Sequence, residues 1–182
     1  MNQKVKMKPS YLKIAFLDRD GTLIKDYPDE KWREIKEPEF LEGSIEGLKR
    51  LKEMGYDFII ITNQYLINDG IISLNDYQQF TGKFLKKLKE ENIDILKIYF
   101  CPHNEKDHCH CKKPKPGMIE QAKKDFLIDM NNSIYIGDSQ VDYLLAKHFT
   151  LTFYGINYNG DNVKSYRSIL DISKQIKKIQ NK

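Results

Sequence analysis

The chain has 182 residues, of which 40% are hydrophobic and 12% aromatic, a composition typical of a globular protein and not of a disordered one. Lys and Arg number 30 and Asp and Glu 26, so the net charge of +4 is too small to indicate nucleic-acid binding, although it is compatible with an anionic substrate. Part of the positive charge lies in Lys-rich stretches at 4–8 and 174–182, which we expect to be solvated.

The first half of the chain alternates between strand-like and helix-like patterns. Ile45, Leu48 and Leu51 recur at helical spacing, and so do Phe80 and Phe84 further on. The predicted elements are, in chain order, a buried strand at 11–17, a charged, proline-bearing loop at 26–40, a helix at 44–54, a buried strand at 58–61 and a helix from about 74 to 91 with Ser73 as its cap.

The second half continues this alternation. The predicted elements are a strand at 95–100, a loop rich in Cys, His and Pro at 101–117, a helix at 118–126, a strand at 133–136, a short helix at 141–148, a strand at 151–154 and a closing helix at 165–180. Strands that alternate with helices predict an α/β protein with a mainly parallel sheet and helices on both faces. We expect one domain over 1–182, with a core at about 11–155.

Polar residues follow four of the predicted strands, at the edge of the sheet where such folds bind ligands. These residues are Asp18 and Asp20 after the first strand, Thr62, Asn63 and Gln64 after the second, Lys112 and Lys113 after the third, and Asp138 and Ser139 after the fourth. Each short motif alone is common in solvated turns. Their occurrence at the ends of successive strands indicates a single functional site.

The residue types at this edge suit phosphoryl transfer. Asp18 and Asp138 offer the carboxylate oxygens that magnesium prefers, and Asp18 can attack phosphorus as a nucleophile. Asp20 can protonate the leaving oxygen and then activate water. Thr62 and Lys113 can stabilise the negative charge of the phosphoryl oxygens. The sequence thus predicts a phosphatase with an aspartyl-phosphate intermediate.

Three other interpretations of these residues stay open. Asp142 either orients Lys113, supports the metal, or begins a helix. A phospho-accepting receiver domain also uses Asp, Thr and Lys at strand ends, but Asp20 and the Cys/His loop argue against it. A zinc-ribbon binding module leaves the aspartates unexplained.

These motifs resemble those of the haloacid dehalogenase superfamily over residues 16 to about 154. The residues that carry the resemblance are Asp18-Arg19-Asp20-Gly21-Thr22-Leu23, Thr62-Asn63-Gln64, Lys113-Pro114 and Gly137-Asp138 with Asp142. The resemblance implies a Rossmann-like three-layer sandwich without a separate cap domain. It also implies magnesium on Asp18, on the backbone carbonyl of Asp20 and on Asp138.

All three cysteines lie in one loop. Cys101, His103, Cys109 and Cys111 form a set of three thiols and one imidazole, which predicts a tetrahedral structural zinc site. His108 and His110 are competing ligands or exposed side chains. No apolar region follows the basic start of the chain and no apolar run is long enough to span a membrane, so we expect a cytoplasmic protein with no secretory signal.

This loop also resembles the branch of the superfamily that contains heptose bisphosphate and histidinol-phosphate phosphatases. The Pro-Gly-Met sequence at 116–118 and the stretch 40–43 favour the heptose type, whereas the short gap between His103 and Cys109 favours the histidinol type. The expected substrate is a small phosphorylated metabolite of the sugar phosphate type. Histidinol phosphate and a polynucleotide 3′-phosphate are the alternatives. The sequence leaves the oligomeric state open, and a monomer is compatible with it.

We expect Asn63, Gln64, Lys112 and Ser139 to contact the substrate. The chain departs from the heptose pattern here, because Asp69 stands near an expected arginine and Lys112 replaces another, which removes bidentate phosphate binding. These departures predict a preference for a monophosphate, or a modified sugar phosphate, over heptose 1,7-bisphosphate. Three bases in the loop at 26–40 and just before it can offset this loss: Lys25, Lys31 and Arg33.

Overall fold

A computed structural model describes residues 11–160 and 163–180, so the Lys-rich stretch at 4–8 lies outside the described residues. One parallel sheet has the strand order β3-β2-β1-β4-β5-β6. The strands are β1 (Ile14–Leu17), β2 (Asp57–Asn63), β3 (Ile95–Cys101), β4 (Ile134–Gly137), β5 (Thr152–Ile156) and β6 (Ser165–Tyr166). The α-helices are α1 (Ser44–Glu53), α2 (Leu74–Glu90), α3 (Gly117–Asp125), α4 (Gln140–His148) and α5 (Ile169–Gln180), with short 3-10 turns at Asp29–Lys31 and Glu105–Asp107.

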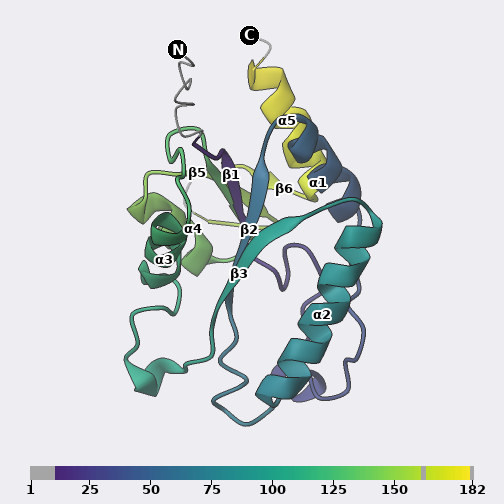
Figure 1. Cartoon of the computed structure of the whole chain (residues 1–182), viewed down its shortest axis with the longest axis vertical. Coiled ribbons are helices and arrows are strands. Elements are labelled where there is room, and N and C mark those ends of the chain that lie inside the picture. Colours follow the sequence, from purple (N-terminus) through teal and green to yellow (C-terminus); the bar gives the residue numbers. More distant parts are fainter. Residues whose placement is uncertain (1–10, 161–162, 181–182) are drawn as a thin grey trace, which may run out of the picture.

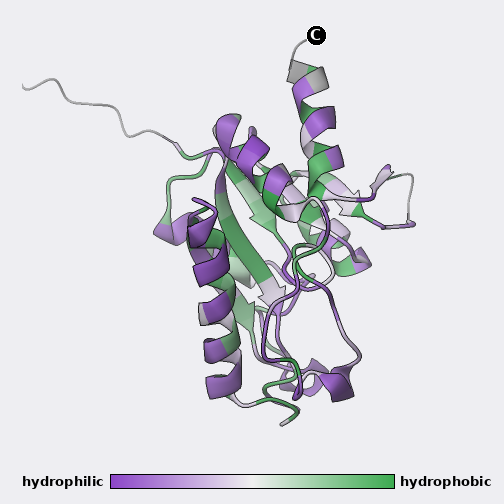
Figure 2. Ribbon diagram, turned by 90° about the vertical axis from the view of Figure 1, so that its right-hand side faces the viewer, coloured by the Kyte–Doolittle hydropathy of each residue, from purple (hydrophilic) through white to green (hydrophobic). Residues whose placement is uncertain are grey.

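Helices cover both faces of the sheet, as the alternating pattern predicts (Figure 1). Side chains of β1 point alternately to the two faces, so Ala15 and Leu17 pack toward α1, α2 and α5, whereas Ile14 and Phe16 pack toward α3 and α4. All four are fully buried. Figure 2 shows the same division, with hydrophobic strands inside and hydrophilic outer faces on the helices. The result is the three-layer α/β sandwich expected for this sequence.

Helix α2 begins where the sequence predicts. The Ser73 hydroxyl accepts a hydrogen bond from the Asp76 backbone nitrogen at 3.0 Å, and the Asp76 carboxylate accepts one in return from the Ser73 backbone. This reciprocal capping satisfies two backbone donors that a helix start leaves open. Tyr77, Phe80 and Phe84 lie buried along the inner face of the helix.

The predicted closing helix at 165–180 was wrong at its start. Ser165 and Tyr166 pair with β5 as the short edge strand β6, and α5 begins only at Ile169. Ile169, Ile172 and Ile176 form a buried stripe at helical spacing, and this stripe starts at the first residue of the helix. No helix in the described ranges is long and apolar enough to cross a membrane.

Candidate active site

The carboxyl ends of β1, β2 and β4 and the segment after β3 meet around one cavity. Leu17 pairs with Ile60 of β2 and with Ile136 of β4, so Asp18 lies at the centre of this edge. The cavity has a volume of about 230 Å³. Its lining residues are Asp18, Asp20, Asp26, Asp29, Trp32, Thr62, Asn63, Gln64, Tyr65, Leu66, Lys113, Asp138, Ser139 and Val141. The structure therefore brings together the strand-end residues that the sequence singles out, with the exception of Lys112.

Lys113 connects two buried carboxylates at the base of the cavity. Its ammonium donates to Asp18 Oδ1 at 2.5 Å and to Asp142 Oδ1 at 2.7 Å. Burial by itself lowers the pKa of Lys113, but the charges of Asp142 and Asp18 outweigh this effect and raise it. Lys113 therefore stays a cation beside the carboxylate predicted to be the nucleophile.

Asp142 orients Lys113 and also helps to cap the start of α4. Two of the three roles proposed for this residue are therefore present in the structure. Oδ1 accepts from Lys113 and from the Tyr135 hydroxyl at 2.9 Å, and Oδ2 accepts from the Ser139 hydroxyl at 2.5 Å. The Ser139 backbone nitrogen also points to Oδ2, at 3.3 Å, as in a helix capping box. Asp142 also lies within 4.8 Å of the ligand atoms of Asp18 and Asp138, but four donors already occupy its oxygens, which makes it a poor metal ligand.

Asp18 and Asp138 fit a divalent cation. Burial, joined by the charges of Asp142, Asp138 and Asp20, raises the pKa of Asp18 despite the nearby Lys113. Burial and then the charge of Asp142 raise the pKa of Asp138 to about 7. Crowded carboxylates of this kind gain stability from a hard cation such as magnesium.

Gly21 lets the turn after β1 pass close to the Asp138 side chain. Its φ of +82° lies in the left-handed region, and a Cβ there would lie 2.0 Å from Asp138 Oδ2. Any larger residue would displace Asp138 from the cavity.

Asn63 and Gln64 bind active-site residues directly. The Asn63 side chain accepts from the Lys113 backbone nitrogen at 2.9 Å and donates to the Lys113 carbonyl at 3.3 Å. The Gln64 amide donates to Asp20 Oδ2 at 2.7 Å and to Thr62 Oγ1 at 2.9 Å. Both side chains also line the cavity, so substrate contact stays a prediction for each.

The loop at 26–40 supplies residues that sequence reasoning did not assign to the site. Asp26, Asp29 and Trp32 line the cavity, and the Tyr65 hydroxyl lies 3.0 Å from each oxygen of Asp29. Burial is the largest cause that raises the pKa of Asp26, and the charges of Asp20 and Asp29 add to it. The only sequence signal for these residues is the charged, irregular character of a loop placed after the first motif.

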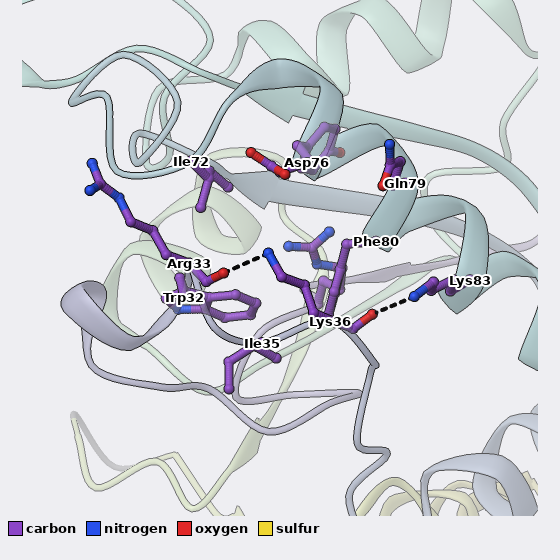
Figure 3. Close-up of a pocket in the computed structure, with 11 residues that line it drawn as sticks. Trp32, Arg33, Ile35, Lys36, Ile72, Asp76, Gln79, Phe80 and Lys83 are labelled. Atoms are coloured by element: carbon purple, nitrogen blue, oxygen red, sulfur yellow. Dashed lines mark hydrogen bonds between the residues drawn. The ribbon is translucent and has the colours of Figure 1, made fainter.

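Basic side chains fasten this loop to its neighbours. A second cavity of about 120 Å³ lies between the loop and α2, with Trp32 common to both cavities (Figure 3). Lys36 donates to the Arg33 carbonyl at 2.6 Å, and Lys83 of α2 donates to the Lys36 carbonyl at 3.0 Å (Figure 3). Arg33 itself donates to the carbonyls of Ile71 and Gly70 at 2.5 and 2.7 Å. Arg33 therefore holds the loop and is absent from the catalytic cavity lining.

Two other bases proposed for substrate binding also have partners. Lys112 forms an ion pair with Glu105 at 2.8 Å and lies 5.0 Å from the centre of the Tyr65 ring. Lys25 forms an ion pair with Glu39 at 3.3 Å. Asp69 accepts a hydrogen bond from the side chain of Asn104 at 2.8 Å and so connects its loop to the cysteine loop.

The four predicted zinc ligands form one cluster. The sulfur and nitrogen atoms of Cys101, His103, Cys109 and Cys111 all lie within 4.8 Å of one another, and the three thiols are free of disulfides. His110 instead lies 2.8 Å from Glu120. His108 ends a 3-10 turn and is also outside the cluster. Three thiols and one imidazole at this spacing match a closed tetrahedral zinc site.

The chain is similar to known phosphatases in sequence and in fold. The model of a protein family described as "Polynucleotide kinase 3 phosphatase" matches residues 13–155. A D-glycero-beta-D-manno-heptose-1,7-bisphosphate 7-phosphatase of Pasteurella multocida is 37% identical over 184 residues, covering 93% of this chain and 99% of the relative. A D-glycero-alpha-D-manno-heptose-1,7-bisphosphate 7-phosphatase of Photorhabdus laumondii is 42% identical over 144 residues, covering 75% of this chain and 77% of the relative.

A solved structure shares the fold. The crystal structure of D,D-heptose 1.7-bisphosphate phosphatase from B. bronchiseptica, complexed with magnesium and phosphate, superposes with a TM-score of 0.80. The alignment covers 94% of this chain and 100% of that chain at 21% sequence identity. The architecture therefore agrees over nearly the whole length of both proteins.

Proposed function

This chain belongs to the haloacid dehalogenase-like phosphatases that include the heptose 1,7-bisphosphate 7-phosphatases, and from that membership we propose that it hydrolyses a sugar phosphate of the heptose type through a phosphate ester on Asp18. The observation that carries the proposal is the contact of Lys113 with Asp18, 2.5 Å apart in a cavity that also contains Asp20 and Thr62. Magnesium held by Asp18, Asp138 and the Asp20 carbonyl would supply the positive charge that lets a carboxylate approach an anionic phosphate.

In the first half of the reaction the substrate phosphate lies against Lys113 and Thr62. The Thr62 hydroxyl accepts from Gln64, so its own proton is free to donate to a phosphoryl oxygen. An Asp18 oxygen bonds to phosphorus while the bond from phosphorus to the leaving oxygen breaks. Asp20 gives its proton to that leaving oxygen.

In the second half water replaces the sugar. Asp20, now ionised, accepts a proton from the water molecule as the water oxygen bonds to phosphorus. The bond between Asp18 and phosphorus then breaks, which regenerates the carboxylate and releases inorganic phosphate. Both halves use the same charges on Lys113 and Thr62 to stabilise the phosphoryl oxygens.

A panel of phosphorylated metabolites tests this assignment. Purified protein with magnesium is expected to release phosphate from heptose phosphates faster than from histidinol phosphate or a 3′-phosphorylated oligonucleotide. The acidic lining of the cavity supports the low rank of the oligonucleotide, because a polynucleotide needs a basic groove, and the similarity to heptose bisphosphate phosphatases supports the high rank of the heptose phosphates. Faster release from the oligonucleotide would contradict this proposal and favour a polynucleotide 3′-phosphatase.

We also propose that the enzyme prefers a monophosphate to heptose 1,7-bisphosphate. Five aspartates line the cavity, and Lys113 is the one Lys or Arg among its described lining residues. Asp26 and Asp29 come from the loop at 26–40 and add two negative charges to this lining, which would repel a remote phosphate. The neighbouring bases Lys112 and Arg33 already have acceptors. A missing charge-assisted contact to the remote phosphate lowers its binding by about 1.5–3 kcal/mol.

Heptose 7-phosphate and heptose 1,7-bisphosphate form a matched pair for this question, because the reacting ester is the same. We expect a higher kcat/KM for the monophosphate. Asp29→Asn keeps an acceptor for Tyr65 and removes one negative charge, so it should raise kcat/KM for the bisphosphate about fivefold, or ~1 kcal/mol. A clearly higher kcat/KM for the bisphosphate in the unmodified enzyme would refute the preference.

We propose that Cys101, His103, Cys109 and Cys111 bind a structural zinc ion. The cluster supports this proposal, and so does its position, because Asn63 joins the residues beyond Cys111 to the catalytic edge through Lys113. Zinc at this place would fix the segment that carries Lys113. The three cysteines are free thiols in one cluster, which also supports the proposed cytoplasmic location.

A further inference from the structure

Three N–H groups converge on the carboxylate of Asp20. Arg19 donates from Nε to Oδ1 at 3.0 Å and from Nη2 to Oδ2 at 2.9 Å, and Gln64 Nε2 donates to Oδ2 at 2.7 Å. Each carboxylate oxygen has two lone pairs, so Oδ2 is fully occupied and Oδ1 keeps one lone pair free. Any proton that Asp20 carries in this arrangement therefore lies on Oδ1.

The Arg19 side chain is buried against α2. Its side chain is 1% exposed, and Nη1 donates to Thr81 Oγ1 at 3.3 Å. The guanidinium lies 5.4 and 5.3 Å from the ring centres of Tyr77 and Phe80, beside the cavity shown in Figure 3. Arg19 is absent from the lining of the catalytic cavity, and the reacting group that its side chain contacts directly is Asp20.

Gln64 reaches Asp20 from the end of β2, the strand next to β1. Its backbone nitrogen donates to the Cys101 carbonyl at 2.7 Å, which fixes the residue to the end of β3. The residue is 4% exposed, and its side chain divides its two amide hydrogens between Asp20 and Thr62. One residue thus aligns the proposed acid/base and a proposed phosphate ligand at the same time.

We propose that Arg19 and Gln64 are positioning residues that fix the Asp20 carboxylate so that Oδ1 is its proton-transfer atom. This inference rests on the proposed function. When the Asp18–phosphorus bond forms and the leaving oxygen departs, the proton moves from Asp20 Oδ1 to that oxygen. When water then displaces Asp18 from phosphorus, a proton of the water returns to Oδ1. Loss of either donor slows both proton transfers far more than it slows the attack by Asp18.

The dependence of the rate on the leaving group distinguishes this role from a structural one. A sugar phosphate has an alkoxide leaving group that needs a proton, whereas 4-nitrophenyl phosphate has a leaving group stable without one. For Gln64→Met and Arg19→Met we expect kcat/KM on the sugar phosphate to fall about 100-fold, the usual scale of general acid catalysis. On the aryl ester Arg19→Met should change kcat/KM little, whereas Gln64→Met should lower it about fivefold, because the Thr62 hydroxyl loses one neutral hydrogen bond. Nitrophenol should appear in a burst equal to the active sites, because hydrolysis of the phosphorylated Asp18 slows.

The variants need controls because Arg19 is a buried charge. Gln64→Met removes one donor and is the milder change. Arg19→Lys keeps the positive charge but loses the bidentate geometry of the guanidinium, so its rate on the sugar phosphate should lie between those of Arg19→Met and the wild type. Gln79→Ala, an exposed change on α2 beside the same second cavity, should match the wild type. An equal fall on both esters, or no burst in the folded Gln64→Met protein, overturns the proposal. If the unmodified protein cleaved neither ester with magnesium, the proposed function itself would fail.

Discussion

The ammonium of Lys113 donates to the carboxylate of Asp18 at 2.5 Å, although 95 positions separate the two residues in the chain. Asp18 follows the central strand β1, and Lys113 lies beyond the cysteine loop after the edge strand β3. The catalytic arrangement therefore depends on the parallel sheet and on the loop that returns from its edge. Four changes to this arrangement have predictable results.

Asp18→Asn should abolish turnover while the protein stays folded. An amide is a poor nucleophile and a poor ligand for magnesium, and the substitution keeps the shape of the side chain. Phosphate release from a sugar phosphate measures the first effect, and circular dichroism with thermal melting measures the second. The covalent mechanism would be wrong if the variant kept a substantial fraction of wild-type activity.

Lys113→Met should lower kcat by more than about 100-fold, since one positive charge at the phosphoryl oxygens is lost. The variant also leaves Asp18 and Asp142 without their buried cation, and removing one partner of a buried ion pair costs roughly 3–5 kcal/mol. Urea unfolding without magnesium measures this loss. Lys115→Met, an exposed change in the same loop, is the matched control and should leave kcat close to wild type. Equal stability of the wild type and Lys113→Met would contradict the ion-pair argument.

Magnesium should stabilise the protein more at pH 8 than at about pH 5.5. The pKa of Asp138 is raised to about 7 in the folded protein, so the folded state binds its proton more tightly than the unfolded chain does. Stability without metal therefore falls as the pH rises from about 4 toward 7. Magnesium binds the ionised carboxylates and offsets this loss, by ~2.7 kcal/mol at a metal concentration of 100 times Kd.

Thermal melts at the two pH values, with and without magnesium, give this comparison. Asp138→Asn provides the control, because it removes both the titration and the ligand. An identical shift of Tm at both pH values would show that magnesium does not bind at this carboxylate.

Cys109→Ser should lose one zinc ion per chain and part of the stability of the fold. Metal binding to a closed site contributes directly to folding, so its loss lowers Tm. Elemental analysis of protein prepared with ample zinc measures the metal content. His108→Ala is the comparison variant, because His108 lies outside the ligand cluster and should keep the zinc. Finding no zinc in the unmodified protein would dispose of the assignment.

The sequence predicts the sheet well because each central strand is a short apolar run that ends in a polar motif. Asp18, Thr62, Lys113 and Asp138 could be placed at one edge from strand order alone, and the structure has them in one cavity. The strand β6 was missed because two residues, Ser165 and Tyr166, are too few to show a periodicity, and they adjoin a clear helical stripe.

The detailed partners of the site residues could not be predicted in the same way. Gln64 was expected to contact substrate, but its amide also holds Asp20 and Thr62, a choice set by side-chain geometry and not by spacing. Asp26, Asp29 and Trp32 lie in an irregular loop, where no periodic pattern indicates which side chains turn inward. Their placement follows from long-range bonds such as that of Lys83 with the Lys36 carbonyl.

Trp32 is the single tryptophan of the chain and forms part of the wall of both cavities. Its side chain is buried, its indole nitrogen donates to the Tyr27 carbonyl at 3.1 Å, and its ring meets Phe80 edge to face at 5.6 Å. All indole fluorescence of the protein therefore originates between the catalytic cavity and α2. Ligand entry into either cavity changes the polarity around one emitter, so the unlabelled protein contains its own optical reporter of occupancy.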